Sequence, residues 1–155
     1  NRLTIAHLLN YSRRVTLSPE LTLNEIRNMT PFGSTECIVH GNFPVMVSEH
    51  DLVGGLFAER KFKDALLKDE KGFAFPVKTD MQGRTYVMNS RELCMLEYVP
   101  EMIGAGVECL RIEAGMYDRD KTRKITRAYM EAMDERMGKG CEGEYTTGHY
   151  FRGVV

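Results

Sequence analysis

Short β-forming runs alternate along this chain with stretches that have the periodicity or the caps of α-helices. The runs are rich in β-branched and other apolar residues and are bounded by Gly, Pro or Ser, which is typical of strands. They predict strands at residues 14–17, 36–40 and 107–112. Helices are predicted at residues 3–9, 22–29 and 119–137.

The predicted helices carry clear local signals. Thr22 is expected to cap the second helix, because Glu25 three residues later completes a capping box. The third helix has one apolar stripe with charges opposite, which indicates packing on one side and water on the other. Its stripe consists of Ile125, Tyr129, Ala132, Met133 and Met137. The basic residues of this helix are interpreted as a solvated face.

A long excursion, residues 42–89, separates the second and third predicted strands. An extended piece at residues 44–48 opens it, and helix formers predict a helix over residues 51–69. Two β runs flanking a Gly-containing turn then predict a hairpin, at residues 73–77 and 84–88.

The segment after the excursion is expected to be helical. Ser90 can cap this helix, its apolar positions are Leu93, Leu96 and Val99, and Pro100 is expected to kink or restart it.

Alternation of strands and helices favours an α/β fold built from parallel β-α units. Its 155 residues correspond to one domain, residues 1–155. Three such strands do not close a barrel, which usually has about eight. The chain is therefore either a small open α/β sheet or part of a larger barrel.

Charge and composition narrow the classes of function. The formal net charge is -1, so the chain has no excess of cations for general nucleic-acid binding. Apolar runs are too short to span a bilayer, and no leader segment is visible, so no membrane partner is expected. The first residue is Asn1 rather than Met, which suggests a processed chain or a piece of a longer one. Four cysteines without a CxxC pair are interpreted as reduced thiols of a cytoplasmic protein.

Candidate functional residues gather at the carboxyl ends of the predicted strands, where parallel β-α folds bind their ligands. On the strand at 36–40, alternation places Glu36, Ile38 and His40 on one face, and Cys37 and Val39 on the other. The candidates at or beyond strand ends are Glu20, His40, Glu49, His50, Asn89, Arg111 and Glu113. For each residue taken singly, a structural role is also consistent with the sequence.

Several known site patterns are absent from the sequence. It contains no HExxH, GxSxG or P-loop motif. Cys37 and His40 are candidate metal ligands, but strand alternation directs them to opposite faces, so they could share a metal only between subunits. The cofactor is left open, with a divalent metal such as zinc as the candidate.

The segment Glu36-Cys37-Ile38-Val39-His40-Gly41, followed by Ser48, resembles the signature of the collagenase-like peptidases, family 32 of the unassigned (U) catalytic type. Blocks on both sides, at residues 14–21, 110–113 and 148–154, are similar to the family in the same order. The family's domain is a modified TIM barrel about twice as long. The resemblance implies that this chain is the C-terminal half of such a barrel, with a helix and a β-hairpin inserted.

The departures from the signature concern its cysteines. Pro44 and Asp51 stand where the signature has cysteine. Family relatives that hold an iron–sulfur cluster, including those of ubiquinone and RNA hydroxylation, use such cysteines, and these clusters require thiolate ligands. The resemblance therefore implies no iron–sulfur cluster in this chain.

Three functions follow from the resemblance. The first is a peptidase that binds a peptide or small acidic ligand at the barrel mouth, with His40 as general base or acid and Glu20 or Glu113 as its carboxylate partner. In this peptidase the substrate would be held by Arg111, Glu49, His50 and Asn89. The second is a non-catalytic peptide-binding or assembly module, and the third is a hydroxylation factor. The expected macromolecular partner is an upstream half of the same polypeptide or a second subunit.

Overall fold

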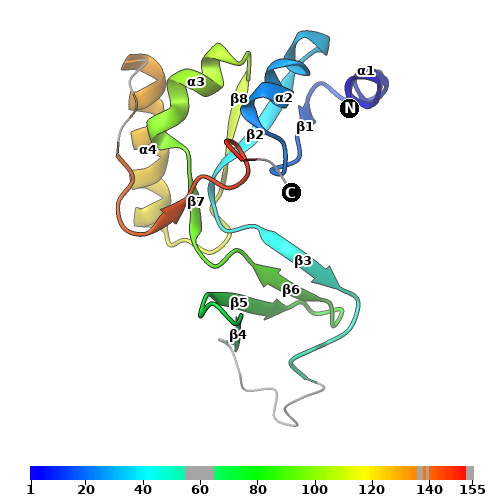
Figure 1. Cartoon of the computed structure of the whole chain (residues 1–155), viewed down its shortest axis with the longest axis vertical. Coiled ribbons are helices and arrows are strands. Elements are labelled where there is room, and N and C mark those ends of the chain that lie inside the picture. Colours follow the sequence, from blue (N-terminus) through cyan, green and yellow to red (C-terminus); the bar gives the residue numbers. More distant parts are fainter. Residues whose placement is uncertain (55–64, 136–137, 139, 153–155) are drawn as a thin grey trace. The chain divides into compact units, whose positions relative to one another are not determined.

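The computed structural model describes residues 1–54, 65–135, 138 and 140–152 (Figure 1). The chain divides into two compact units. The first unit combines Asn1–Gly41 with Leu93–Val155, and the second is Asn42–Glu92, which closely matches the predicted excursion. A single domain across the whole chain stays a prediction.

The first unit contains helices and a mixed sheet. In the described residues its helical segments are α1 (Arg2–Leu8), α2 (Leu23–Arg27), η1 (Thr30–Phe32), η2 (Leu96–Tyr98), α3 (Val99–Gly104) and α4 (Arg119–Glu135). The strands of its sheet are β1 (Val15–Thr16), β2 (Thr35–Gly41), β7 (Glu92–Cys94), β8 (Cys109–Glu113) and β9 (Tyr145–Thr146).

Strand β2 is the centre of this sheet. It pairs in parallel with β1 on one side and with β8 on the other, which confirms the three predicted parallel strands (Figure 1). The last residues of β2 also pair antiparallel with β7, His40 with Cys94 and Gly41 with Leu93, and β9 pairs with β7. The described strands form an open sheet, so the α/β class is confirmed and the half-barrel stays a prediction.

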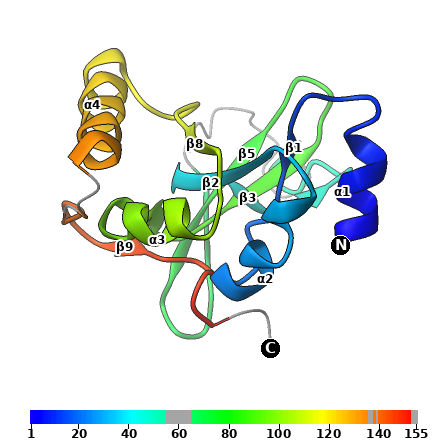
Figure 2. The same cartoon turned by 90° about the horizontal axis from the view of Figure 1, so that it is seen from above.

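Helices cover one face of β2, and Figure 2 shows α2 and α3 along the same side of this strand. Thr22 caps α2 with the predicted capping box: its hydroxyl accepts a hydrogen bond from the Glu25 amide, and the Glu25 carboxylate accepts one from the Thr22 amide. The fully or nearly fully buried side chains here include Ile26, Val39, Val99, Met102, Tyr129 and Tyr150. None of the helices in the described ranges is long and apolar enough to cross a membrane.

The helix predicted after Ser90 is wrong at its start. Residues Glu92–Cys94 form β7 because their backbone pairs with the end of β2, which overrides local helix preference. A single 3-10 turn, η2, follows, and α3 begins only at Val99 with Pro100 in its first turn. Proline is tolerated there because the first amides of a helix have no intrahelical partner.

The second unit is an antiparallel sheet in the order β3-β6-β5-β4. The predicted hairpin is confirmed, and the Asp80 carboxylate closes its turn by accepting hydrogen bonds from the amides of Gln82 and Arg84. The strands are β3 (Pro44–Ser48), β4 (Ala65–Lys68), β5 (Ala74–Thr79) and β6 (Thr85–Met88).

The prediction of a helix over residues 51–69 is wrong for the residues of this range that the structure describes. Residues 55–64 lie outside the described residues. Ala65–Lys68 form the edge strand β4, with Leu66 opposite Pro76 of β5. These residues have good helix propensity, but pairing with a neighbouring strand decides their conformation.

The expectation of reduced thiols is also wrong in part. Cys94 and Cys141 form a disulfide that ties β7 to the segment before β9, whereas Cys37 and Cys109 are free. The sequence separation of the pair is 47 residues, so no local spacing pattern announces it.

Gly41 ends β2 at a position that excludes a side chain. Its φ of 113° lies in the region that favours glycine, and an added Cβ would overlap the backbone carbonyl of Glu113 in β8. The close approach of these two strand ends therefore depends on a glycine here.

We predict that the 155-residue chain self-associates when it is alone. Among the described strands, β1 and β8 each pair only with β2, so each keeps an outer edge with backbone groups available for pairing. Size-exclusion chromatography with light scattering should give an oligomer or aggregate. A compact monomer that unfolds cooperatively would contradict the prediction and the half-barrel with it.

Candidate functional site

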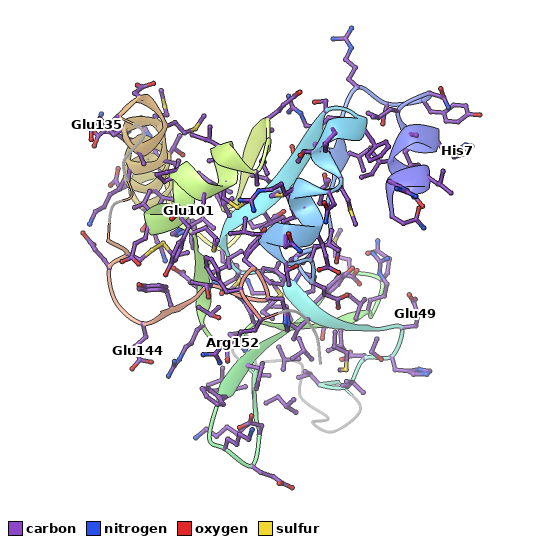
Figure 3. The ribbon with its side chains drawn as sticks, turned by 45° about the horizontal axis from the view of Figure 1, so that its top comes forward. His7, Glu49, Glu101, Glu135, Glu144 and Arg152 are labelled. Atoms are coloured by element: carbon purple, nitrogen blue, oxygen red, sulfur yellow. A yellow bond between two sulfur atoms is a disulfide. The ribbon has the colours of Figure 1, made fainter. Side chains whose placement is uncertain are left out.

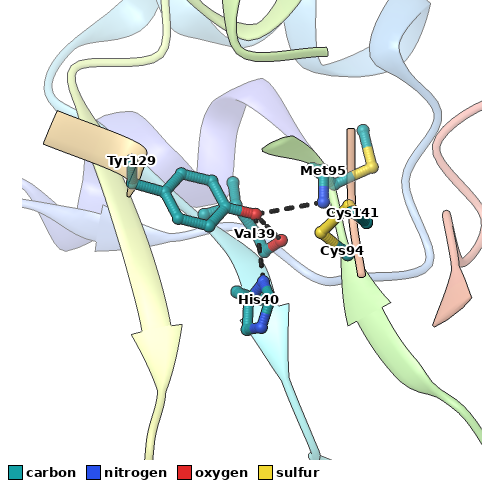
Figure 4. The surroundings of a disulfide bond; sticks show 6 residues. All are labelled: Val39, His40, Cys94, Met95, Tyr129 and Cys141. Carbon is teal, nitrogen blue, oxygen red and sulfur yellow. Dashed lines mark hydrogen bonds between the residues drawn. A yellow bond between two sulfur atoms is a disulfide. The ribbon is translucent and has the colours of Figure 1, made fainter. Parts of the chain in front are cut away.

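His40 lies in a buried hydrogen-bond network with the hydroxyl of Tyr129 from α4 (Figure 4). The Tyr129 hydroxyl donates to the Val39 carbonyl at 2.8 Å and accepts from the Met95 amide at 3.1 Å. The His40 Nδ1 lies 3.3 Å from the same hydroxyl oxygen. Burial raises the pKa of Tyr129, so this hydroxyl keeps its proton at all ordinary pH values.

This network assigns the proton on the His40 ring. A tyrosine hydroxyl has one proton, and the Val39 carbonyl, which has no proton of its own, accepts it. The tautomer of His40 that fits this arrangement is the one in which Nδ1 carries a hydrogen and donates it to the Tyr129 oxygen. In the neutral ring the lone pair then resides on Nε2, which is the atom that can accept a proton or bind a ligand.

A bulge in β2 decides which face His40 occupies. Ile38 pairs with Arg111 and His40 with Ile112, so β2 advances two residues while β8 advances one. Such a bulge reverses the alternation of side chains beyond it. His40 consequently lies on the face opposite Glu36, and the predicted shared face of Glu36, Ile38 and His40 is wrong.

The other face carries an ion-pair cluster centred on Glu36. Its carboxylate accepts hydrogen bonds from the Thr16 hydroxyl at 2.8 Å and from Arg111 at 3.5 Å, and Arg14 lies 3.8 Å away. Arg111 also pairs with Glu113 at 2.6 Å, so this predicted pair is brought together. The Arg111 side chain is 46% exposed, which leaves part of its guanidinium open to a ligand.

The electrostatics of the cluster favour the ionised form of Glu36. Burial alone would raise the pKa of this carboxyl, but hydrogen bonds from Thr16 and Cys109 and the charge of Arg111 lower it below its usual value. Burial and the hydrogen bond to Glu36 raise the pKa of the Cys109 thiol. Cys109 is therefore a protonated donor here and not an activated nucleophile.

The remaining predicted residues lie elsewhere. Glu20 is exposed in the loop after β1, and its amide donates to the Ser18 hydroxyl. Glu49, His50 and Asn89 belong to the second unit, and Glu49 lies just beyond the end of β3 (Figure 3). Asn89 is buried and uses its amide to bond the backbone of Phe43 and Arg91, which fastens β3 to β6.

The bulge in β2 also corrects the prediction for the candidate metal ligands: Cys37 pairs with Leu110 and His40 with Ile112, so the two side chains lie on the same face and not on opposite faces. Cys37 is only 1% exposed, and burial raises the pKa of its thiol to about 12. Among the described residues, no group of three or more His, Cys, Asp or Glu side chains is arranged so that it could hold a metal ion. We therefore derive no reaction step through a metal at Cys37 and His40.

Comparison with known proteins identifies the family. The sequence profile of peptidase family U32 matches residues 6–150, nearly the whole chain. The chain belongs to peptidase family U32. This finding confirms the resemblance seen in the signature segment at Glu36–Gly41.

Two curated proteins are similar to this chain. An uncharacterized protease of Methanocaldococcus jannaschii is 24% identical over 99% of this chain and 45% of its own length. A tRNA hydroxylation protein P2 of Bacillus subtilis is 26% identical over 78% of this chain and 43% of its own length. This U32 chain thus spans less than half the length of either relative, and no solved structure matches it significantly.

The iron–sulfur chemistry known in the U32 family does not fit the residues of this chain. Its cysteines are either paired in the disulfide or separate, with Cys37 buried and Cys109 beside Glu36. Asp51, at a signature cysteine position, instead accepts hydrogen bonds from the amides of Val53 and Gly54 and closes a turn. We therefore derive no step through a cluster.

Sequence reasoning missed two important groups of this U32 chain. The sequence predicts Tyr129 only as part of an apolar stripe. The role of its hydroxyl follows from its hydrogen bonds to Val39 in β2 and to Met95 after β7, which no local pattern reveals. Glu36 was placed on the right strand, but its partners Thr16 and Arg111 come from strands distant in sequence.

We predict that Glu36→Gln destabilises the first unit by about 1 kcal/mol at neutral pH. The folded pKa of Glu36 is lowered, so its stabilisation is complete above the unfolded pKa and disappears as the pH falls through the folded pKa. The difference from wild type in denaturant unfolding should therefore shrink once the pH falls below about 5 and disappear below the lowered folded pKa. Exposed Glu101→Gln controls for the loss of one charge, and a pH-independent difference would contradict the assignment.

Proposed function

We propose that this U32 chain is part of a peptidase whose first unit belongs to a modified TIM barrel. The family match and the protease-named relative support hydrolysis of peptides. A partner that completes the sheet, either the rest of a longer polypeptide or a second copy, belongs to the same proposal, as does a cytoplasmic location.

The observation that carries the proposal is the buried contact of 3.3 Å between His40 Nδ1 and the Tyr129 hydroxyl. Because Tyr129 holds the Nδ1 hydrogen, the ring presents Nε2 as a base in a constant orientation. In the proposed reaction Nε2 takes the proton of an attacking water and returns it to the leaving amine. Tyr129 thus does for His40 what a carboxylate was expected to do, and Glu113 instead pairs with Arg111.

Arg111, which lies on the face of the sheet opposite His40, is the proposed binding group for a ligand carboxylate apart from the proposed base. Its guanidinium is half exposed and already oriented by Glu36 and Glu113, so little side-chain freedom is lost when a ligand binds. Glu20, Glu49, His50 and Asn89 remain proposed contributors to substrate binding in the complete protein.

A second candidate is a peptide-binding module without catalysis. It is favoured by the burial of His40, which is only 8% exposed and therefore poorly reached by water and substrate in this chain. The hydroxylation function of the Bacillus relative is not proposed, because this chain lacks the signature cysteines at Pro44 and Asp51.

We expect His40→Gln to reduce hydrolysis of quenched-fluorescent gelatin or casein peptides by at least about 100-fold, the usual contribution of a general base. Tyr129→Phe keeps the ring but removes the hydroxyl, so it should lower kcat by about tenfold with little change in KM. Exposed His7→Gln is the matched control and should leave both constants unchanged.

The same assay separates the two candidates. Hydrolysis that persists in His40→Gln would rule out His40 as the base. Peptide binding to wild type without any hydrolysis, measured by fluorescence polarisation, would establish the binding module instead. Loss of that binding in Arg111→Gln would then locate the ligand on the ion-pair cluster.

A further inference from the structure

The disulfide lies beside the His40 network. Cys94 is the register partner of His40 in the pairing of β2 with β7, and the next residue, Met95, donates its amide to both the Val39 carbonyl and the Tyr129 hydroxyl (Figure 4). The Met95 amide, one residue from Cys94, therefore holds both the Val39 carbonyl and the Tyr129 hydroxyl. The same hydroxyl contacts the His40 ring.

The two sulfur atoms differ in their access to solvent. Cys94 is 3% exposed, whereas Cys141 is half-buried in the segment that leads to β9. Glu142, next to Cys141, forms an exposed ion pair with Lys124 of α4 at 2.6 Å. That exposed pair is weak, but β9 begins four residues after Cys141 and pairs with β7, so the Cys141 segment remains beside Cys94 when the sulfur–sulfur bond is broken and the bond can form again.

We propose that Cys94 and Cys141 are a reversible redox site that controls the orientation of His40. Its reaction partner is a low-molecular-weight thiol–disulfide couple of the glutathione type. This proposal deepens the proposed function because it regulates the same histidine, but it does not depend on hydrolysis being observed.

The exchange proceeds in two balanced steps. The thiolate of Cys141, the accessible residue, attacks one sulfur of the small disulfide, forms a mixed disulfide and releases one small thiol. The Cys94 thiolate then attacks the Cys141 sulfur and releases the second small thiol. The two cysteines are oxidised, one disulfide is reduced to two thiols, and the two cysteine protons end on the released thiols.

The disulfide influences the orientation of His40 through strand β7. This strand has three residues and is held between β2 and β9, and the disulfide fastens it covalently to the segment that carries β9. Reduction lets β7 open locally more often, because a short strand has few bonds of its own. The Met95 amide then leaves the Tyr129 hydroxyl, and the hydroxyl becomes free to change its bonds with Val39 and His40.

The test compares the chain treated with glutathione disulfide with the chain treated with dithiothreitol. Intact mass after thiol alkylation reports the disulfide. Amide exchange followed by mass spectrometry should be about tenfold faster at Met95 after reduction. Selective ¹⁵N labelling of the four histidines, with His40→Gln for assignment, should show the Nδ1–H tautomer in the oxidised chain and a mixture in the reduced chain.

Two variants make the outcome decisive. Cys141→Ser should behave as the reduced chain under both treatments, and Cys109→Ser, which removes a free thiol outside the pair, should respond as wild type. Failure of glutathione disulfide to oxidise the pair would overturn the proposal. So would identical His40 spectra and Met95 exchange in the two states, whether or not peptides are hydrolysed.

Discussion

A single buried hydroxyl group, that of Tyr129, joins the elements of the first unit around His40. The Tyr129 oxygen joins a helix to two strands, because it donates to Val39 in β2 and accepts from Met95 beside β7. All of these atoms are buried, so water cannot replace a lost bond and each missing partner would cost about 1–3 kcal/mol. The position of α4 on the sheet and the state of the His40 ring are therefore determined together.

The bulge in β2 separates two kinds of chemistry on one strand. Before the bulge, Glu36 faces the ion-pair cluster with Arg111; after it, His40 faces the helices and Tyr129. A regular strand would have placed the carboxylate and the imidazole on the same face of the sheet. The bulge keeps the imidazole apart from the charges and in contact with a neutral hydroxyl.

Local features of the fold could be predicted from the sequence, and features set by distant pairing could not. The capping box at Thr22 and the hairpin around Gly83 depend on neighbouring residues and were correctly predicted. The strand at Glu92–Cys94 depends on the end of β2, some fifty residues earlier, and local propensity favoured a helix. The face of His40 depends on register with β8, which no periodicity within β2 reveals.

The pairing of Gly41 with Leu93 has a consequence for how this protein could evolve. These residues are the last before the second unit and the first after it, and directly paired antiparallel residues lie only about 5 Å apart. A segment whose two ends meet so closely can be acquired, exchanged or deleted in one genetic event while the remaining chain keeps its course. The second unit can therefore be exchanged as one segment. Its length and sequence are free to diverge faster than those of the sheet in the first unit.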